Sequence, residues 1–221
     1  MSNPIPESVE QLAHVVGPDG DDVLAEMDEY ADREGFPTVG PAVGGWLELL
    51  ARMTGAERVF EFGSGYGYSA YWFCRVLPDD GEIVLTEIDA DELDLAREYL
   101  GRGDFGATAH FELGDAIETI ESYDGPFDVV LIDNEKHRYR EAFESVREKV
   151  APGGIVVADN AVAGSTIDHE DVRRLLDGES IEATGPTEGI AEYLSAVRAD
   201  PDFRTSLLPV GEGVAVSYRV E

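Results

Sequence analysis

Short apolar runs alternate with stretches of helical periodicity along the chain from residue 58 onward. Several runs are continuous, such as Val-Val-Leu-Ile at 129–132 and Ile-Val-Val-Ala at 155–158. Continuous runs are typical of parallel strands that are buried on both faces. We therefore expect strands at 58–62, 82–88, 108–113, 127–133 and 154–159.

Helical patterns fill the gaps between these runs, at 67–77, 90–101, 138–150 and 168–176. Repeated alternation of strand and helix predicts a doubly wound α/β sheet. The tail differs, because a helical stretch at 188–199 precedes two apolar segments, 203–208 and 214–220, that flank a Gly-containing loop. Such a pair predicts an antiparallel hairpin. The expected fold is a Rossmann-like, mostly parallel sheet with helices on both faces and a C-terminal antiparallel hairpin.

The length of 221 residues fits one domain. We expect an N-terminal helical segment over 1–55, with a break at Gly35-Phe36-Pro37, and the Rossmann-like core over 56–221. The N-terminal segment either covers the active site or forms the surface of a homodimer. No apolar run is long enough to span a membrane, and no secretory signal is visible, so the sequence predicts a cytoplasmic protein.

Acidic residues outnumber basic ones by 47 to 16, and they are spread along the whole chain. This pattern indicates a halophilic surface, since salt screens repulsion between like charges. The alternative is an acidic patch for a basic partner. The same charge makes nucleic acid a poor partner. The single cysteine, Cys74, lies in an apolar helical stretch and is expected to be buried.

The segment Glu61-Phe-Gly63-Ser-Gly65-Tyr-Gly-Tyr68-Ser69 follows a predicted strand and opens a predicted helix. Its glycines permit a tight turn and a close approach of a ligand to the backbone. Their spacing departs from the nicotinamide fingerprint and fits the loop of S-adenosylmethionine enzymes. Glu87 ends the second strand, where an acid meets the ribose hydroxyls of a cofactor. Asp115 ends the third strand; it either contacts the adenine or caps the next helix.

Further polar side chains end the fourth and fifth strands. Asp133 follows one of them, and Asp159-Asn160 follow the other. These hard oxygens suit Mg²⁺, with Ca²⁺ or Mn²⁺ as alternatives. The competing interpretation is that Asp159-Asn160 only shape a turn. His137 and His169 are expected at the surface.

At this point the sequence resembles the metal-dependent catechol and caffeoyl-coenzyme-A type O-methyltransferases. The resemblance covers residues 39–221. It rests on the Gly-rich segment, Glu87, Gly114-Asp115-Ala116, Pro152-Gly-Gly154, the closing Leu208-Pro-Val-Gly-Glu-Gly213, and above all Asp133-x-x-Lys136-x-x-Tyr139 with Asp159-Asn160.

The resemblance implies S-adenosylmethionine as the cofactor, a divalent metal on Asp133, Asp159 and Asn160, and Lys136 as the base that takes the proton from a hydroxyl of a small acceptor. Metal coordination would acidify one of two vicinal hydroxyls, and the resulting oxyanion would attack the sulfonium methyl in line. The cofactor would contact a set that includes the second-strand acid and the first metal ligand: Val39, Glu61, Gly63, Gly65, Tyr68, Ser69, Glu87, Asp115, Ala116 and Asp133.

Two features depart from the family pattern. Asn134-Glu135 replace the usual Ala-x before the lysine, which adds an acid beside the site. In animal catechol enzymes a carboxylate near the C-terminus helps to hold the second hydroxyl, but Gly213-Val-Ala215 stands here, with Glu212 close by. The segment 177–189, expected to border the pocket, indicates no acceptor.

Three other functions compete with this one. They are a methyltransferase of the same fold that needs no metal, a nicotinamide oxidoreductase, and a binding module without catalysis. The glycine spacing argues against the second, and the complete set of Asp133, Lys136, Asp159 and Asn160 argues against the third.

Overall fold

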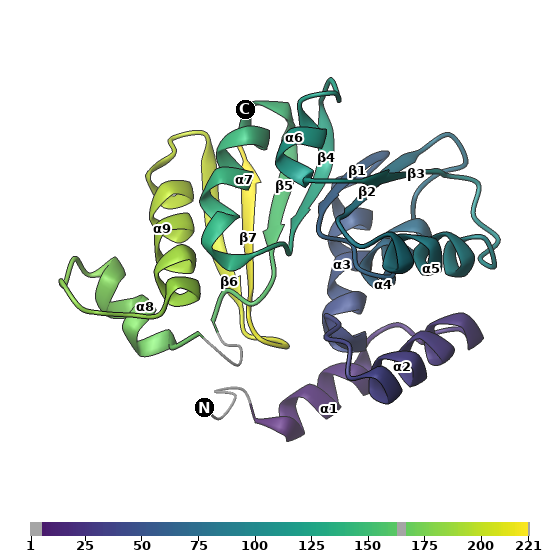
Figure 1. The fold of residues 1–221 in the computed structure, drawn as a ribbon, viewed down its shortest axis with the longest axis horizontal. Coiled ribbons are helices and arrows are strands. Elements are labelled where there is room, and N and C mark those ends of the chain that lie inside the picture. Colours follow the sequence, from purple (N-terminus) through teal and green to yellow (C-terminus); the bar gives the residue numbers. More distant parts are fainter. Residues whose placement is uncertain (1–5, 163–166, 221) are drawn as a thin grey trace.

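The computed structural model describes residues 6–162 and 167–220. Its centre is a seven-stranded sheet in the order β3-β2-β1-β4-β5-β7-β6. The first five strands pair in parallel, and β7 lies antiparallel between β5 and β6 (Figure 1). The strands are β1 (Arg58–Phe62), β2 (Glu82–Glu87), β3 (Thr108–Leu113), β4 (Phe127–Ile132), β5 (Val150–Ala158), β6 (Phe203–Leu208) and β7 (Val214–Arg219).

Helices cover both faces of the sheet (Figure 1). They are α1 (Glu7–Val16), α2 (Asp22–Glu34), α3 (Gly40–Thr54), α4 (Tyr68–Cys74), α5 (Ala90–Leu100), α6 (Ala116–Ile120), α7 (Tyr139–Val146), α8 (His169–Leu176) and α9 (Gly185–Ala199), with short 3-10 turns η1 (Lys136–Arg138) and η2 (Arg147–Lys149). This arrangement confirms the predicted Rossmann-like class and the C-terminal antiparallel hairpin.

Successive residues of each central strand enter two different cores, because side chains alternate across a sheet. Val129 and Leu131 of β4 pack with α2–α5 on one face. Val130 and Ile132 pack with α6, α7, α8 and α9 on the other. Both cores are continuous, which explains why the strands read as uninterrupted apolar runs.

The sequence prediction was wrong around residue 150. A helix over 138–150 and a strand from 154 were expected, but α7 ends at Val146 and β5 already begins at Val150. Val150 pairs with Phe127, and the register then shifts before Val129 pairs with Ile155. Pro152, Gly153 and Gly154 thus lie within a strand irregularity, where proline and glycine are tolerated, and not in a turn before the strand. The five-residue helix α6 follows Asp115, where the sequence left a helix open without giving its range.

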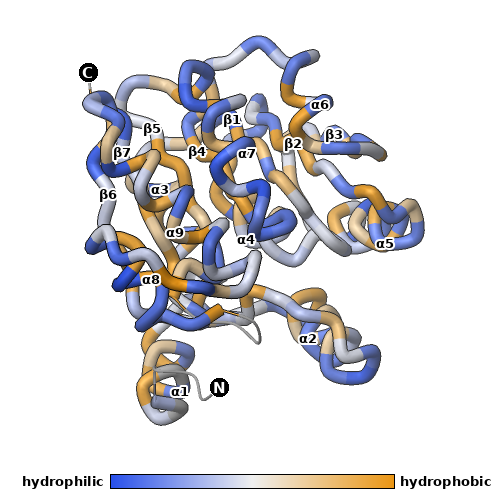
Figure 2. The backbone as a smooth tube through the Cα atoms, turned by 60° about the vertical axis from the view of Figure 1, so that its left-hand side comes forward, coloured by the Kyte–Doolittle hydropathy of each residue, from blue (hydrophilic) through white to orange (hydrophobic). Residues whose placement is uncertain are grey.

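The N-terminal helix α1 stands apart from the sheet at the edge of the molecule, where it contacts α3 (Figures 1 and 2). Its apolar residues Val9, Leu12, Val15 and Val16 are all exposed. Over the described part of the chain, no helix has the length and apolar character that crossing a membrane requires.

Candidate functional site

One cavity of about 800 Å³ lies at the carboxyl ends of the parallel strands. It brings together all but one of the predicted site residues: Val39, Gly63, Gly65, Tyr68, Ser69, Glu87, Asp115, Ala116, Asp133, Lys136, Asp159 and Asn160. The exception is Glu61, which lies beneath the Gly-rich turn. The cavity occupies the place where open α/β sheets bind ligands, beside the point at which the strand order reverses between β1 and β4.

The Gly-rich turn is fixed by close approach to neighbouring backbone. Gly63 has φ +80°, and a Cβ there would lie 2.9 Å from the carbonyl oxygen of Asp133. Gly67 has φ +84°, and a Cβ there would lie 2.9 Å from the Cβ of Ala96. Both positions therefore need glycine, since other residues rarely adopt this conformation and have no room here.

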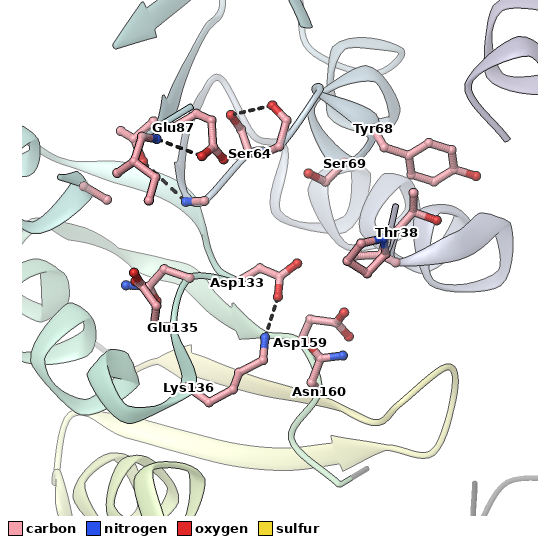
Figure 3. Close-up of a pocket in the computed structure, with 18 of the residues that line it drawn as sticks. Thr38, Ser64, Tyr68, Ser69, Glu87, Asp133, Glu135, Lys136, Asp159 and Asn160 are labelled. Atoms are coloured by element: carbon pink, nitrogen blue, oxygen red, sulfur yellow. Dashed lines mark hydrogen bonds and ion pairs between the residues drawn. The ribbon is translucent and has the colours of Figure 1, made fainter. Parts of the chain in front are cut away.

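Glu87 closes the turn from the end of β2 (Figure 3). Its Oε2 accepts a hydrogen bond from the backbone N–H of Gly65 at 2.9 Å, and its Oε1 accepts one from that of Ile88 at 2.8 Å. Oε1 also accepts a hydrogen bond from the backbone N–H of Asp89 at 3.1 Å, so the lone pair that remains for a ligand is on Oε2. The neighbouring Asp89 caps α5 by accepting a hydrogen bond from the N–H of Asp91.

Glu61 on β1 is a fully buried acid. Neither of its carboxylate oxygens has a hydrogen-bond partner among the described residues. Burial raises the pKa of Glu61 to about 8; the Ser69 hydroxyl opposes the rise, and the Asp133 carboxylate adds to it. Such a group is protonated in the empty protein at neutral pH and becomes ionised when a cation binds nearby.

The motif Asp133-x-x-Lys136-x-x-Tyr139 forms one hydrogen-bonded cluster. The Lys136 ammonium donates to Asp133 Oδ1 at 2.7 Å and to the Tyr139 hydroxyl at 2.6 Å. The Tyr139 hydroxyl also lies 3.2 Å from the backbone oxygen of Asp159. Burial raises the pKa of Tyr139 well above its usual value, so its hydroxyl remains a donor. Tyr139 thus links the ends of β4 and β5 and holds Lys136 on the cavity wall.

Asp159 lies beside this cluster at the end of β5 (Figure 3). Its Oδ1 is buried and lacks a hydrogen-bond partner within the described chain. Burial, and then the nearby Asp133 carboxylate, raise the pKa of Asp159 above its usual range. An orphaned buried acceptor beside a second carboxylate is the arrangement that a bound cation would complete.

Within residues 6–162 and 167–220, no three His, Cys, Asp or Glu side chains group closely enough to hold a metal. A metal on Asp133 and Asp159 would therefore need the amide oxygen of Asn160, which lines the same cavity. The donor set fits a hard divalent cation that keeps part of its water.

Asp115 caps α6, and its Oδ1 accepts from the N–H of Ile117 at 2.9 Å. Its Oδ2 forms an ion pair with Arg138 at 2.6 Å. The sequence left two roles open for Asp115, contact with the adenine and capping of the next helix. The structure shows the capping role. Arg138 was not predicted, because its partner is 23 positions away in the sequence.

Other cavity residues were missed, chiefly in connecting segments: Phe36, Pro37, Thr38, Ile88, Ile167 and Gly211. Asn134, Glu135 and Glu212, which the sequence placed beside the site without a role, also line the cavity. The sequence offered one signal for the missed residues, because Ile88 is an apolar residue between two acids, Glu87 and Asp89. In the structure its side chain is 71% exposed. The expectation for 177–189 was wrong: all of these residues are described, and none lines the cavity. His137 and His169 are exposed and Cys74 is buried, as expected.

The fold and the site define a class: a Rossmann-like protein with a Gly-rich turn and a polar cluster of side chains at adjoining strand ends. Residues 18–220 match the model of a family described as O-methyltransferase. The chain belongs to this family of S-adenosylmethionine-dependent O-methyltransferases and is an enzyme of that kind. This confirms the resemblance seen in the sequence.

Individual relatives agree with the family. The chain is 31% identical to a catechol O-methyltransferase of Niastella koreensis, over 80% of this chain and 84% of the relative. An O-methyltransferase of Bacillus cereus, solved in complex with SAH, has a TM-score of 0.80 at 24% identity and covers 96% of this chain and 97% of its own. The O-methyltransferase TomG of Streptomyces achromogenes, solved with SAM, has a TM-score of 0.81 at 22% identity, with 97% and 96% covered.

Proposed function

We propose that this enzyme transfers the methyl group of S-adenosylmethionine to one of two vicinal hydroxyls on a small aromatic acceptor, with a divalent metal held by Asp133, Asp159 and Asn160. The observation that carries the proposal is the meeting of Asp133, Lys136 and Asp159 on one cavity wall, with the buried Asp159 Oδ1 unpaired. The relative from Niastella koreensis is named for the same reaction class.

The residues of the chain divide the work. In this proposal Glu87 binds the ribose hydroxyls, and the backbone around Gly63, Gly65 and Ser69 surrounds the methionine part. Val39, Tyr68 and Ala116 form further parts of the wall, with Asp115 at the adenine end. A divalent cation, when bound, would polarise the acceptor hydroxyl and offset the charges of Asp133 and Asp159.

Lys136 enters this step as a neutral amine, takes the hydroxyl proton onto Nζ and becomes the ammonium. The acceptor oxygen then forms a bond to the methyl carbon while the carbon–sulfur bond breaks. The electron pair of the broken bond stays on sulfur, which gives S-adenosylhomocysteine. The cavity contributes by holding oxygen, carbon and sulfur in line. Tyr139 keeps Lys136 in place through their 2.6 Å hydrogen bond.

The test is methylation of catechol and other vicinal-hydroxyl phenols with labelled S-adenosylmethionine in high salt, with and without Mg²⁺. We expect excess chelator to abolish methyl transfer and added Mg²⁺ to restore it. Cofactor binding, followed by calorimetry, should survive chelation and serves as the control. Equal turnover in chelator would instead support a metal-independent methyltransferase of the same fold.

We also propose that the enzyme is a homodimer and that the exposed apolar face of α1 and α3 is its interface. This face comprises Val9, Leu12, Val15 and Val16 of α1 and Trp46, Leu49 and Met53 of α3. Leu12 is 62% exposed and Met53 is 72% exposed. In a chain with net charge −31, a surface rich in exposed apolar side chains is where two copies approach with the least repulsion.

Light scattering should accordingly give the mass of a dimer for the wild type and of a monomer for the double variant Leu12→Asp, Met53→Asp. The control is Leu207→Asp on β6, an apolar residue that is 48% exposed outside this face. It should leave the dimer intact. A monomeric wild type at micromolar concentration would refute the proposal.

A further inference from the structure

We propose that Glu212 is a positioning residue that fixes the side-chain amide of Asn160 so that its oxygen, and not its nitrogen, faces the cavity. The inference rests on the proposed metal function, since it concerns the third ligand of that site. Glu212 lies 52 positions from Asn160, in the turn between β6 and β7.

The chemistry of the contact decides the orientation of the amide. Asn160 Nδ2 lies 2.6 Å from Glu212 Oε2. A carboxylate offers only acceptors, whereas an amide offers a donor at one corner and an acceptor at the other. Rotating the Asn160 amide by half a turn would place two acceptor oxygens against each other. Asn160 Nδ2 therefore donates to Glu212, and in this orientation Asn160 Oδ1 is the atom that can face the cavity.

The same turn also holds the backbone of the Asn160 segment. The N–H of Ala161 donates to the carbonyl of Gly213 at 2.7 Å, and that of Val162 donates to the carbonyl of Glu212 at 3.1 Å. Asn160 has φ 53°, in the left-handed region that residues other than glycine rarely adopt. The tip of the C-terminal hairpin thus stabilises both the backbone and the side chain of this residue, and Figure 3 shows the hairpin running beneath it.

A purely electrostatic role for Glu212 must be separated from an orienting one, because any carboxylate near a cation raises its affinity. Glu135 supplies the matched control. It is an exposed acid on the wall of the same cavity, and no hydrogen bond between it and Asn160 is present in the described structure. Changing either acid to glutamine removes one negative charge from the cavity, but only the change at Glu212 alters the partner of Asn160.

The experiment measures Mn²⁺ binding to the full chain by electron paramagnetic resonance, without cofactor or acceptor. Glutamine at 212 can both donate and accept, so it allows either orientation of the amide. We expect Glu212→Gln to weaken Mn²⁺ binding roughly tenfold or more, in line with the usual effect of removing a partner that orients a metal ligand. Glu135→Gln should weaken it by less than about threefold, the smaller effect expected of an exposed charge.

A second variant distinguishes orientation from misfolding. Aspartate at 160 has oxygens at both corners, so it needs no orienting partner. Adding Asn160→Asp to Glu212→Gln should restore Mn²⁺ binding to near the wild-type value. If the wild type binds no Mn²⁺, the proposed metal site fails. If the wild type binds but Glu212→Gln behaves like Glu135→Gln, or the double variant is not restored, the metal site stands and the role of Glu212 is refuted.

Discussion

Turnover of Lys136→Ala is expected to fall by roughly 10²–10⁴, the usual share of a general base. Lys136 Nζ lies on the cavity wall, 2.7 Å from Asp133 Oδ1. Its loss should leave cofactor affinity unchanged. Raising the pH should partly rescue the variant, because more of the acceptor is then ionised without help. Lys136→Arg should not restore activity, since the guanidinium stays protonated.

The chain provides a matched control for this prediction, because it has only one other lysine. Lys149 donates to the backbone carbonyls of Ile120 and Tyr123 and does not line the cavity. Lys149→Ala should therefore retain turnover when activity is scaled to folded protein. If Lys136→Ala and Lys149→Ala have the same turnover, the base must be another group.

Cofactor binding at pH 7 is expected to release a proton from Glu61. The pKa of this buried carboxyl is raised to about 8 in the empty protein, so it is mostly protonated at pH 7. S-adenosylmethionine brings an ammonium and a sulfonium, and nearby positive charge favours the ionised carboxylate. Cofactor affinity should therefore increase as the pH rises from 6 to 8. Glu61→Gln should lower it by about 10- to 100-fold, the equivalent of a charge-assisted hydrogen bond.

Calorimetry in buffers of different ionisation enthalpy measures this proton directly. The wild type should show a dependence on the buffer that Glu61→Gln lacks. The same substitution should not destabilise the empty protein. A carboxyl whose folded-state pKa is raised loses stability as the pH rises from its unfolded value, near 4.5, through about 8. Above pH 8 the melting temperature of Glu61→Gln should thus equal or exceed that of the wild type. A heat of binding independent of the buffer would exclude Glu61.

The parts of the fold that could be predicted are those determined by local pattern. The predicted bounds of β1 and β3 match the structure to the residue, because glycine-containing turns lie on both sides of each segment. The start of β5 could not be predicted in this way. Pro152 and Gly153 are turn residues by composition, and only the pairing of Val150 with Phe127 shows that they lie inside a strand.

In the candidate site, too, the residues placed by local pattern could be predicted, and those placed by distant partners could not. Residues at strand ends, such as Glu87 and Asp133, could be found because the end of a predicted strand fixes their place. Arg138 could not be found, and Glu212 was placed near the site without its partner Asn160, since each of these residues acts through a partner distant in the sequence. The assignment of ligands to these residues, the preference for salt and the acceptor all stay predictions.

Part of the cavity wall consists of connecting segments, at residues 36–39, 167 and 211–212. None of these residues belongs to one of the seven strands. Substitutions at 36–38 can therefore reshape the cavity at little cost to the sheet, whereas Ile167 is buried in the core and Gly211 has no room for a Cβ. We therefore expect acceptor range to diverge between relatives through these segments, except at Val39, which belongs to the proposed cofactor wall. Comparing these few positions, and not overall identity, is the better guide to which relatives share a substrate.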